Sequence, residues 1–76
     1  MIVEGQEIDQ ETVEWFTAHI LRQKEPFRAQ DMEIKAFRNG LPSAVSARFV
    51  DRLFQKLRKA RKIQFVGGYW SVVEGA

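Results

Sequence analysis

The sequence predicts a small α+β domain in which three helices are followed by a two-stranded β-hairpin, with a short extended piece before the second helix. Three observations predict this order. Apolar residues recur at helical spacing over residues 43–61. Two alternating apolar runs flank Gly67-Gly68, as they do in a hairpin. A capping residue, Asp9, and a stop signal, Glu25-Pro26, bound an earlier helix.

The first helix is expected over residues 10–23, because Asp9 is a good N-cap and Glu25-Pro26 cannot continue a helix. At helical spacing one side carries Val13, Phe16, Thr17, Ile20 and, just past the helix end, Lys24. The opposite side carries Trp15, Ala18 and Arg22. Residues 1–8 have no pattern of their own and are set apart as an N-terminal segment that need not be ordered. The domain itself is expected over residues 9–74.

The second helix is expected over residues 30–38, after the extended piece "PFRAQDM". Met32 and Ala36 are its expected core positions. Asn39-Gly40 should end it, because Gly readily adopts the left-handed conformation that closes many helices.

The third helix shows the clearest periodicity. It is expected from Ser43, as the cap, to Arg61. Its core face gathers Val45, Ser46, Phe49, Val50, Leu53, Leu57 and Ala60. Its outer face carries Ala44, Ala47, Arg48, Asp51, Gln55, Arg58 and Lys59.

The hairpin is expected to join residues 63–66 to residues 69–73 through Gly67-Gly68, which supply the positive φ of a two-residue turn. That turn fixes the register as Val66 opposite Tyr69, Phe65 opposite Trp70, Gln64 opposite Ser71 and Ile63 opposite Val72. Phe65 and Trp70 then share the core face with Ile63 and Val72. A stacking platform for single-stranded nucleic acid is the alternative role for Trp70.

Composition argues against several classes of protein. There is no long apolar run, no Cys and a single His, so a membrane span, a disulfide framework and a zinc site are not expected. No cofactor or metal is expected, and the residues offer no recognisable catalytic group. His19 is interpreted as a boundary residue of the first helix rather than as a general base. A cytoplasmic location is expected, with association to the nucleoid. In a eukaryote the expected location is the nucleus.

The charges are unevenly distributed along the chain. Residues 1–21 hold five acids and neither Lys nor Arg, so residues 22–76 hold all 12 bases against the other five acids, a net charge of +7. One interpretation is an anionic partner for the basic part. The alternative is solvation combined with matching of helix dipoles.

The third helix has the properties of a surface that reads DNA. Ala44 and Ala47 put only small side chains on its outer face near the N-terminus, where a helix approaches the floor of the major groove. Arg48, Asp51 and Gln55 follow on the same face with polar groups for base edges. Asp51 can accept a hydrogen bond from a cytosine amino group, but a pair with Arg48 one turn earlier is the preferred interpretation. Phosphate contacts are expected from Ser43, Arg52, Arg58, Lys59 and Lys62.

The order of elements resembles the winged helix-turn-helix family, over residues 9 to about 73. The residues that carry the resemblance are "PFRAQDM", "GLPSAVSARFVDRLFQKLRKARKI" and "FVGGYWSVV". The resemblance implies that the third helix is the recognition helix, that the hairpin is the wing, and that Phe27-Arg28 forms a short strand in the wing's sheet. It implies a non-enzymatic regulator that binds double-stranded DNA. The wing tip lacks Lys and Arg, so contact there falls to the amides of Gly67 and Gly68 or to the Tyr69 hydroxyl.

A rival interpretation is a winged-helix module that docks another protein, with a basic helix that is merely solvated. Trp15, Ala18 and Arg22 would form its interface, since an exposed aromatic residue is a common interface anchor. Trp15 could instead be covered by Ile2 or Val3, or could mediate a homodimer.

Overall fold

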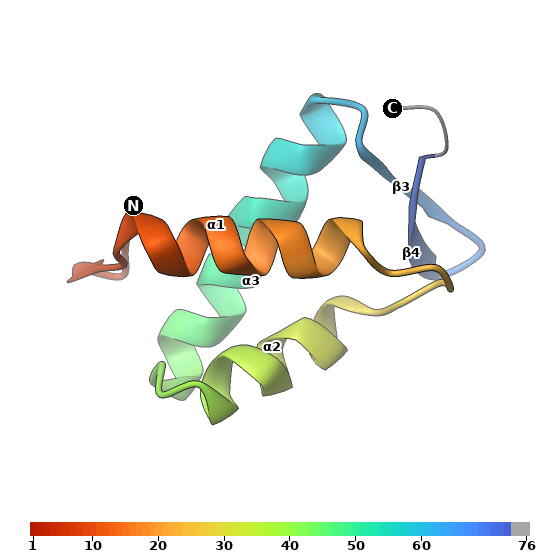
Figure 1. Cartoon of the computed structure of the whole chain (residues 1–76). Helices are drawn as coiled ribbons and strands as arrows, with labels where there is room; N and C mark the ends of the chain where they lie inside the picture. Colours follow the sequence, from red (N-terminus) through yellow and green to blue (C-terminus); the bar gives the residue numbers. More distant parts are fainter. Residues whose placement is uncertain (74–76) are drawn as a thin grey trace.

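Three helices and two antiparallel hairpins make up the computed structural model, which describes residues 1–73 (Figure 1). In chain order the elements are β1 (Ile2–Val3), β2 (Gln6–Glu7), α1 (Gln10–Leu21), α2 (Ala29–Arg38), α3 (Ser43–Lys59), β3 (Ile63–Val66) and β4 (Tyr69–Val72). The predicted α+β class, with a hairpin after the third helix, is confirmed. The expected end of the domain at residue 74 lies outside the described residues. Within residues 1–73, no helix has the length and apolar character needed to cross a membrane.

Residues 1–8, which the sequence sets apart as an N-terminal segment, form the hairpin of β1 and β2. Glu4 and Gly5 make its two-residue turn with φ of +50° and +76°. Val3 is fully buried and Ile8 nearly so. The Ile8 amide donates a hydrogen bond of 2.7 Å to the Met1 carbonyl, which closes the open end of the hairpin. This second hairpin was not predicted.

Helix α1 begins as expected, because the Asp9 carboxylate accepts a hydrogen bond of 2.8 Å from the Thr12 amide. That bond lowers the pKa of Asp9 by stabilising its charged form. The expected core residues Val13, Phe16 and Ile20 are buried. The helix ends at Leu21, two residues before the expected boundary.

Helix α2 ends in the predicted glycine cap. Gly40 has φ +97°, and its amide donates to the Phe37 carbonyl at 3.0 Å. The Leu41 amide donates to the Ala36 carbonyl at 3.2 Å, which completes the paired bonds of a Schellman motif. Met32 and Ala36 are buried as expected, and Ile34 and Phe37 are exposed.

Helix α3 differs from its prediction at both ends. Pro42, and not Ser43, occupies the N-cap position, so the expected Ser43 cap is wrong. The extended ψ of Pro42 (150°) and the bond from the Ser46 amide to its carbonyl (2.8 Å) start the helix one residue earlier than a serine cap would. The helix ends at Lys59 because Arg61 turns left-handed, with φ +61°.

The core face of α3 is shifted slightly from the predicted stripe. Val45, Ser46, Phe49, Val50, Leu53 and Leu57 are buried as expected. Ala60 is exposed, because it lies beyond the last helical turn. Phe54, which was not predicted, is only 1% exposed. Its ring packs edge-on against Phe27 at 5.7 Å and Trp70 at 5.1 Å between ring centres.

The β3–β4 hairpin has the predicted register at all four pairs, from Ile63 opposite Val72 to Val66 opposite Tyr69. Gly67 and Gly68 both have positive φ, as a two-residue primed turn requires. Phe27 pairs with Trp70 through two backbone hydrogen bonds of 2.8 Å, so the extended piece before α2 joins this sheet at a single residue.

Phe65 corrects the predicted core face of the hairpin. Ile63 is buried at its base and Trp70 is partly buried against the core, but Phe65 is 57% exposed. The core covers only the base of the hairpin, so the strand residues nearer the turn project into solvent. Phe65 keeps contact with Trp70 through a tilted ring pair at 5.2 Å. The partial burial of Trp70 favours its packing role over a stacking platform.

These positions predict unequal costs for two phenylalanine truncations. Phe54→Ala should lower the free energy of unfolding by about 3–5 kcal/mol, since it leaves a cavity where three aromatic rings meet. Phe65→Ala should cost about 1 kcal/mol or less, because it loses one ring contact at an exposed position. Urea unfolding followed by circular dichroism measures both. Similar losses from the two variants would contradict the assigned core.

Candidate nucleic-acid interface

The outer face of α3 is solvent-exposed along its whole length. Gln55 is half-buried, and the remaining predicted members of this surface on the helix are exposed: Ser43, Ala44, Ala47, Arg48, Asp51, Arg52, Arg58 and Lys59. The structure therefore brings the predicted residues of α3 onto one surface, because the opposite side of the same helix is buried in the core.

Arg48 forms an exposed ion pair with the N-terminal hairpin. Its Nε lies 3.4 Å from the Glu4 Oε1, and both side chains are more than half exposed. Among the described residues 1–73, Arg48 pairs with Glu4 and with no other acid. The expected Arg48–Asp51 pair is therefore wrong. Glu4 reaches Arg48 from the N-terminal hairpin, and Asp51 is exposed on the outer face of α3 without an ion pair to Arg48.

Two further contacts order side chains along α3. Arg52 donates from its guanidinium to the Ile2 carbonyl at 2.9 Å, so the N-terminal hairpin contacts both Arg48 and Arg52, one turn apart. Arg58 donates from Nε to the Gln55 Oε1 at 3.2 Å. The Gln55 amide oxygen thus has a partner within the helix, while its NH₂ group can donate to another acceptor.

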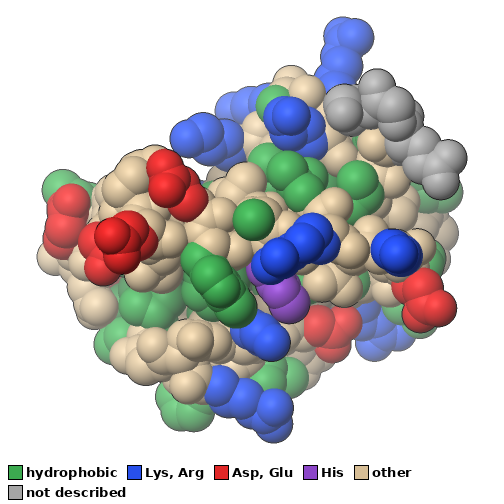
Figure 2. Space-filling view, in the orientation of Figure 1, with side chains coloured by type: hydrophobic (Ala, Val, Ile, Leu, Met, Phe, Trp, Pro, Cys, Tyr) green, Lys and Arg blue, Asp and Glu red, His purple; other side chains and the backbone are tan. Residues whose placement is uncertain are grey.

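Positive charge gathers at the C-terminal end of α3, and one group of acidic side chains lies around the N-terminal hairpin. Figure 2 shows Lys and Arg side chains clustered around that helix end, and Asp and Glu side chains over the N-terminal hairpin and the start of α1. The cluster includes the predicted Arg58, Lys59 and Lys62, which are all exposed. The acids of the N-terminal hairpin and the bases at the end of α3 therefore occupy different parts of the surface, and the cluster of bases produces a local field that favours anions at that helix end.

The turn of the β3–β4 hairpin is open to solvent. Gly67 and Gly68 are exposed, and a Cβ at either position would meet no other group within 4 Å. Tyr69 contacts Arg28, whose guanidinium donates to the Tyr69 hydroxyl at 2.9 Å and lies 4.9 Å from the centre of its ring.

Sequence reasoning missed Arg28 as part of this surface. The sequence placed Phe27-Arg28 beside the wing but gave no register for that strand. In the structure the antiparallel pair of Phe27 with Trp70 puts Arg28 opposite Tyr69. Arg28 brings positive charge to a hairpin that has none near its turn.

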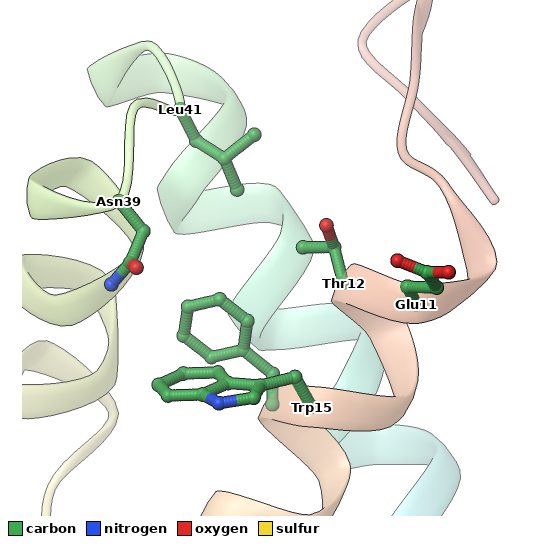
Figure 3. Close-up of a pocket in the computed structure, with 6 residues that line it drawn as sticks. Glu11, Thr12, Trp15, Asn39 and Leu41 are labelled. Atoms are coloured by element: carbon green, nitrogen blue, oxygen red, sulfur yellow. The ribbon is translucent and has the colours of Figure 1, made fainter.

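The predicted protein-contact residues of α1 lie in two places, since Trp15 lines a cleft beside the α2–α3 connection and Ala18 lines a hollow together with Lys56 and Lys62. Trp15 is 43% exposed, and Ala18 and Arg22 are exposed. The Trp15 ring stacks on His19 at 5.2 Å, and the Lys35 Nζ lies 5.8 Å from its centre. Neither Ile2 nor Val3 is among the residues that line the cleft beside Trp15. Figure 3 shows Trp15 in a shallow cleft, facing Asn39 and Leu41 of the α2–α3 connection.

The described residues 1–73 contain no group of three His, Asp or Glu side chains that could hold a metal ion. Comparisons with protein-family models, with curated proteins and with solved structures find no match. What this surface binds is therefore inferred from its residues and their chemistry.

The surroundings of His19 predict a pH effect on stability. Partial burial, followed by the charges of Lys35 and Arg22, lowers the pKa of His19 below its usual 6.5. The unfolded chain then binds the proton more tightly, so this contribution to stability is full above pH 6.5 and is lost as pH falls through the folded-state pKa. The melting temperature of His19→Gln should fall less on acidification than that of the parent. An NMR titration of the His19 ring that gave a pKa at or above 6.5 would contradict this.

Proposed function

We propose that the chain is a winged helix-turn-helix domain that binds double-stranded DNA, with α3 in the major groove. The observation that carries the proposal is the exposed face of α3. Its first turns carry small side chains, its middle carries base-reading polar groups, and its end carries a cation cluster. Such a sequence of properties along one helix suits a groove with bases at its floor and phosphates at its rims.

The arrangement of elements supports this proposal. Three helices precede the β3–β4 hairpin, and the second strand of that hairpin pairs with Phe27, just before α2. This order matches the winged-helix pattern. In that pattern β3 and β4 form the wing. The resemblance bears on architecture alone, since fold does not decide function.

Base contacts are assigned to the outer face of α3 between Ala44 and Gln55. Ala44 and Ala47 let the helix backbone approach the groove floor. The Arg48 guanidinium suits the O6 and N7 acceptors of guanine, and the Gln55 amide can donate to a base edge. Asp51, without an arginine partner in the helix, can accept from a cytosine amino group.

Phosphate contacts are assigned to the flanks and the end of α3. Arg52, Arg58, Lys59 and Lys62 supply the positive charge, and Ser43 lies at the helix N-terminus, whose free amides favour phosphate. In the wing, the Gly67 and Gly68 amides are accessible and the Tyr69 hydroxyl is exposed. Arg28 adds a cation beside Tyr69. A small regulator or accessory factor in transcription, replication or recombination fits such a domain.

A protein-interaction module is the second candidate, favoured by the exposed Trp15. A partner or a second copy bound through Trp15, Ala18 and Arg22 would leave the outer face of α3 free. The two functions are therefore compatible. A homodimer through α1 would place two recognition helices on one duplex.

Alanine variants on α3 test the proposal, measured on a site selected from random duplexes and on mixed-sequence DNA. Arg48→Ala and Gln55→Ala should weaken the selected site by about 1–3 kcal/mol and relax base preference, because each removes a base contact. Lys59→Ala and Lys62→Ala should weaken all sequences similarly. Each should also reduce the slope of log K against log salt by about 0.9, the effect of one lost phosphate contact.

Trp15→Ala is the matched control, because Trp15 lies outside the proposed surface and its loss should leave the affinity of a single domain for DNA unchanged. If the parent binds no duplex at low salt, DNA binding is excluded. If all four α3 variants lose affinity uniformly, α3 does not read bases, and the assignment of roles fails.

A further inference from the structure

The N-terminal hairpin is fixed beside α3. Val3 is fully buried and contributes to the same core as α3. The Met1 ammonium donates to the Ile8 carbonyl at 3.1 Å, and the Ile8 amide returns a bond to the Met1 carbonyl. These contacts hold β1, β2 and the turn between them against the body of the domain, so the turn residue Glu4 has a defined position.

This hairpin contacts the two arginines on one flank of α3. Arg52 donates to the Ile2 carbonyl, and Arg48 pairs through Nε with the Glu4 carboxylate. The two contacts are independent, since one uses a backbone oxygen and the other a side chain. Together they place an acceptor-bearing turn at the edge of the face that is assigned to bases.

Glu4 has an unfavourable backbone conformation for its residue type. Its φ of +50° is the left-handed region, where a two-residue primed turn prefers Asn, Asp or Gly. Residues held in such conformations concentrate at functional sites. Asn would suit this turn better, but its side chain is shorter and carries no charge. What Glu supplies is a carboxylate that reaches Arg48.

We propose that Glu4 is a positioning residue that orients Arg48 toward a base, an inference that rests on the DNA-binding function proposed above. A guanidinium engaged at Nε keeps its two NH₂ groups free, and these can donate together to the O6 and N7 of guanine. The carboxylate also repels phosphate, which disfavours the use of Arg48 as a backbone contact. The N-terminal hairpin thereby becomes part of the surface that sets specificity.

Three variants test this role: Glu4→Gln, Glu4→Asn and the control Glu7→Gln. Glu7 is an exposed acid of the same hairpin whose ion pair is with the N-terminus and not with α3, so its loss changes the net charge equally. Glu4→Asn removes the carboxylate while favouring the turn, which guards against an effect of misfolding. Each is measured for affinity on the selected site and on mixed-sequence duplex, as a function of salt.

Both Glu4 variants should lower the ratio of selected to mixed-sequence affinity by up to about fivefold, the scale of an exposed ion pair. They should also steepen the salt dependence by up to about 0.9, because the released Arg48 can neutralise a phosphate. Glu7→Gln should do neither. In an Arg48→Ala background, Glu4→Gln should behave as Glu7→Gln does.

If both Glu4 variants match Glu7→Gln in specificity and salt slope while the parent binds its site, Glu4 does not position Arg48 and this inference alone fails. If the parent binds no duplex DNA, the proposed function fails and this inference fails with it.

Discussion

The packing of Phe54 against Phe27 and Trp70 is the contact on which the arrangement depends. Phe54 belongs to α3, Phe27 to the extended residues before α2, and Trp70 to β4, so one ring joins three separate segments. The backbone pair between Phe27 and Trp70 joins two of these segments, the residues before α2 and β4, a second time. The β3–β4 hairpin is thereby held at a set position relative to α3. Arg28, next to Phe27, comes to Tyr69 for the same reason.

On the other flank, α3 is held by the N-terminal hairpin through Arg48 and Arg52. Both hairpins are thus fixed relative to α3, and the N-terminal one contributes polar groups to its exposed stripe. This arrangement gives α3 a defined outer face in a chain of only 76 residues. Because exposed ion pairs contribute little to stability, Arg48–Glu4 is better understood as a device for orientation than as a support of the fold.

Local patterns predicted the features that depend on neighbouring residues. Gly67-Gly68 determined the register of its hairpin, Asp9 capped α1, and the apolar stripe of α3 identified six core residues. Phe54 was missed because it lies at the margin of that stripe, and only the meeting with Phe27 and Trp70 buries it. The Arg48–Glu4 contact was missed for a similar reason. It joins residues far apart in the chain, and Glu is an unexpected residue for the left-handed turn that brings it there.

The most direct test of the central claim, that the outer face of α3 contacts DNA, is a chemical-shift map of the ¹⁵N-labelled domain titrated with duplex DNA. The largest amide shifts should fall on α3, at Ala47, Arg48 and Gln55, with smaller shifts at Gly67 and Gly68. The amide signals of Trp15 and its neighbours should show no shift. Shifts that cluster on α1 while α3 remains unperturbed would contradict it.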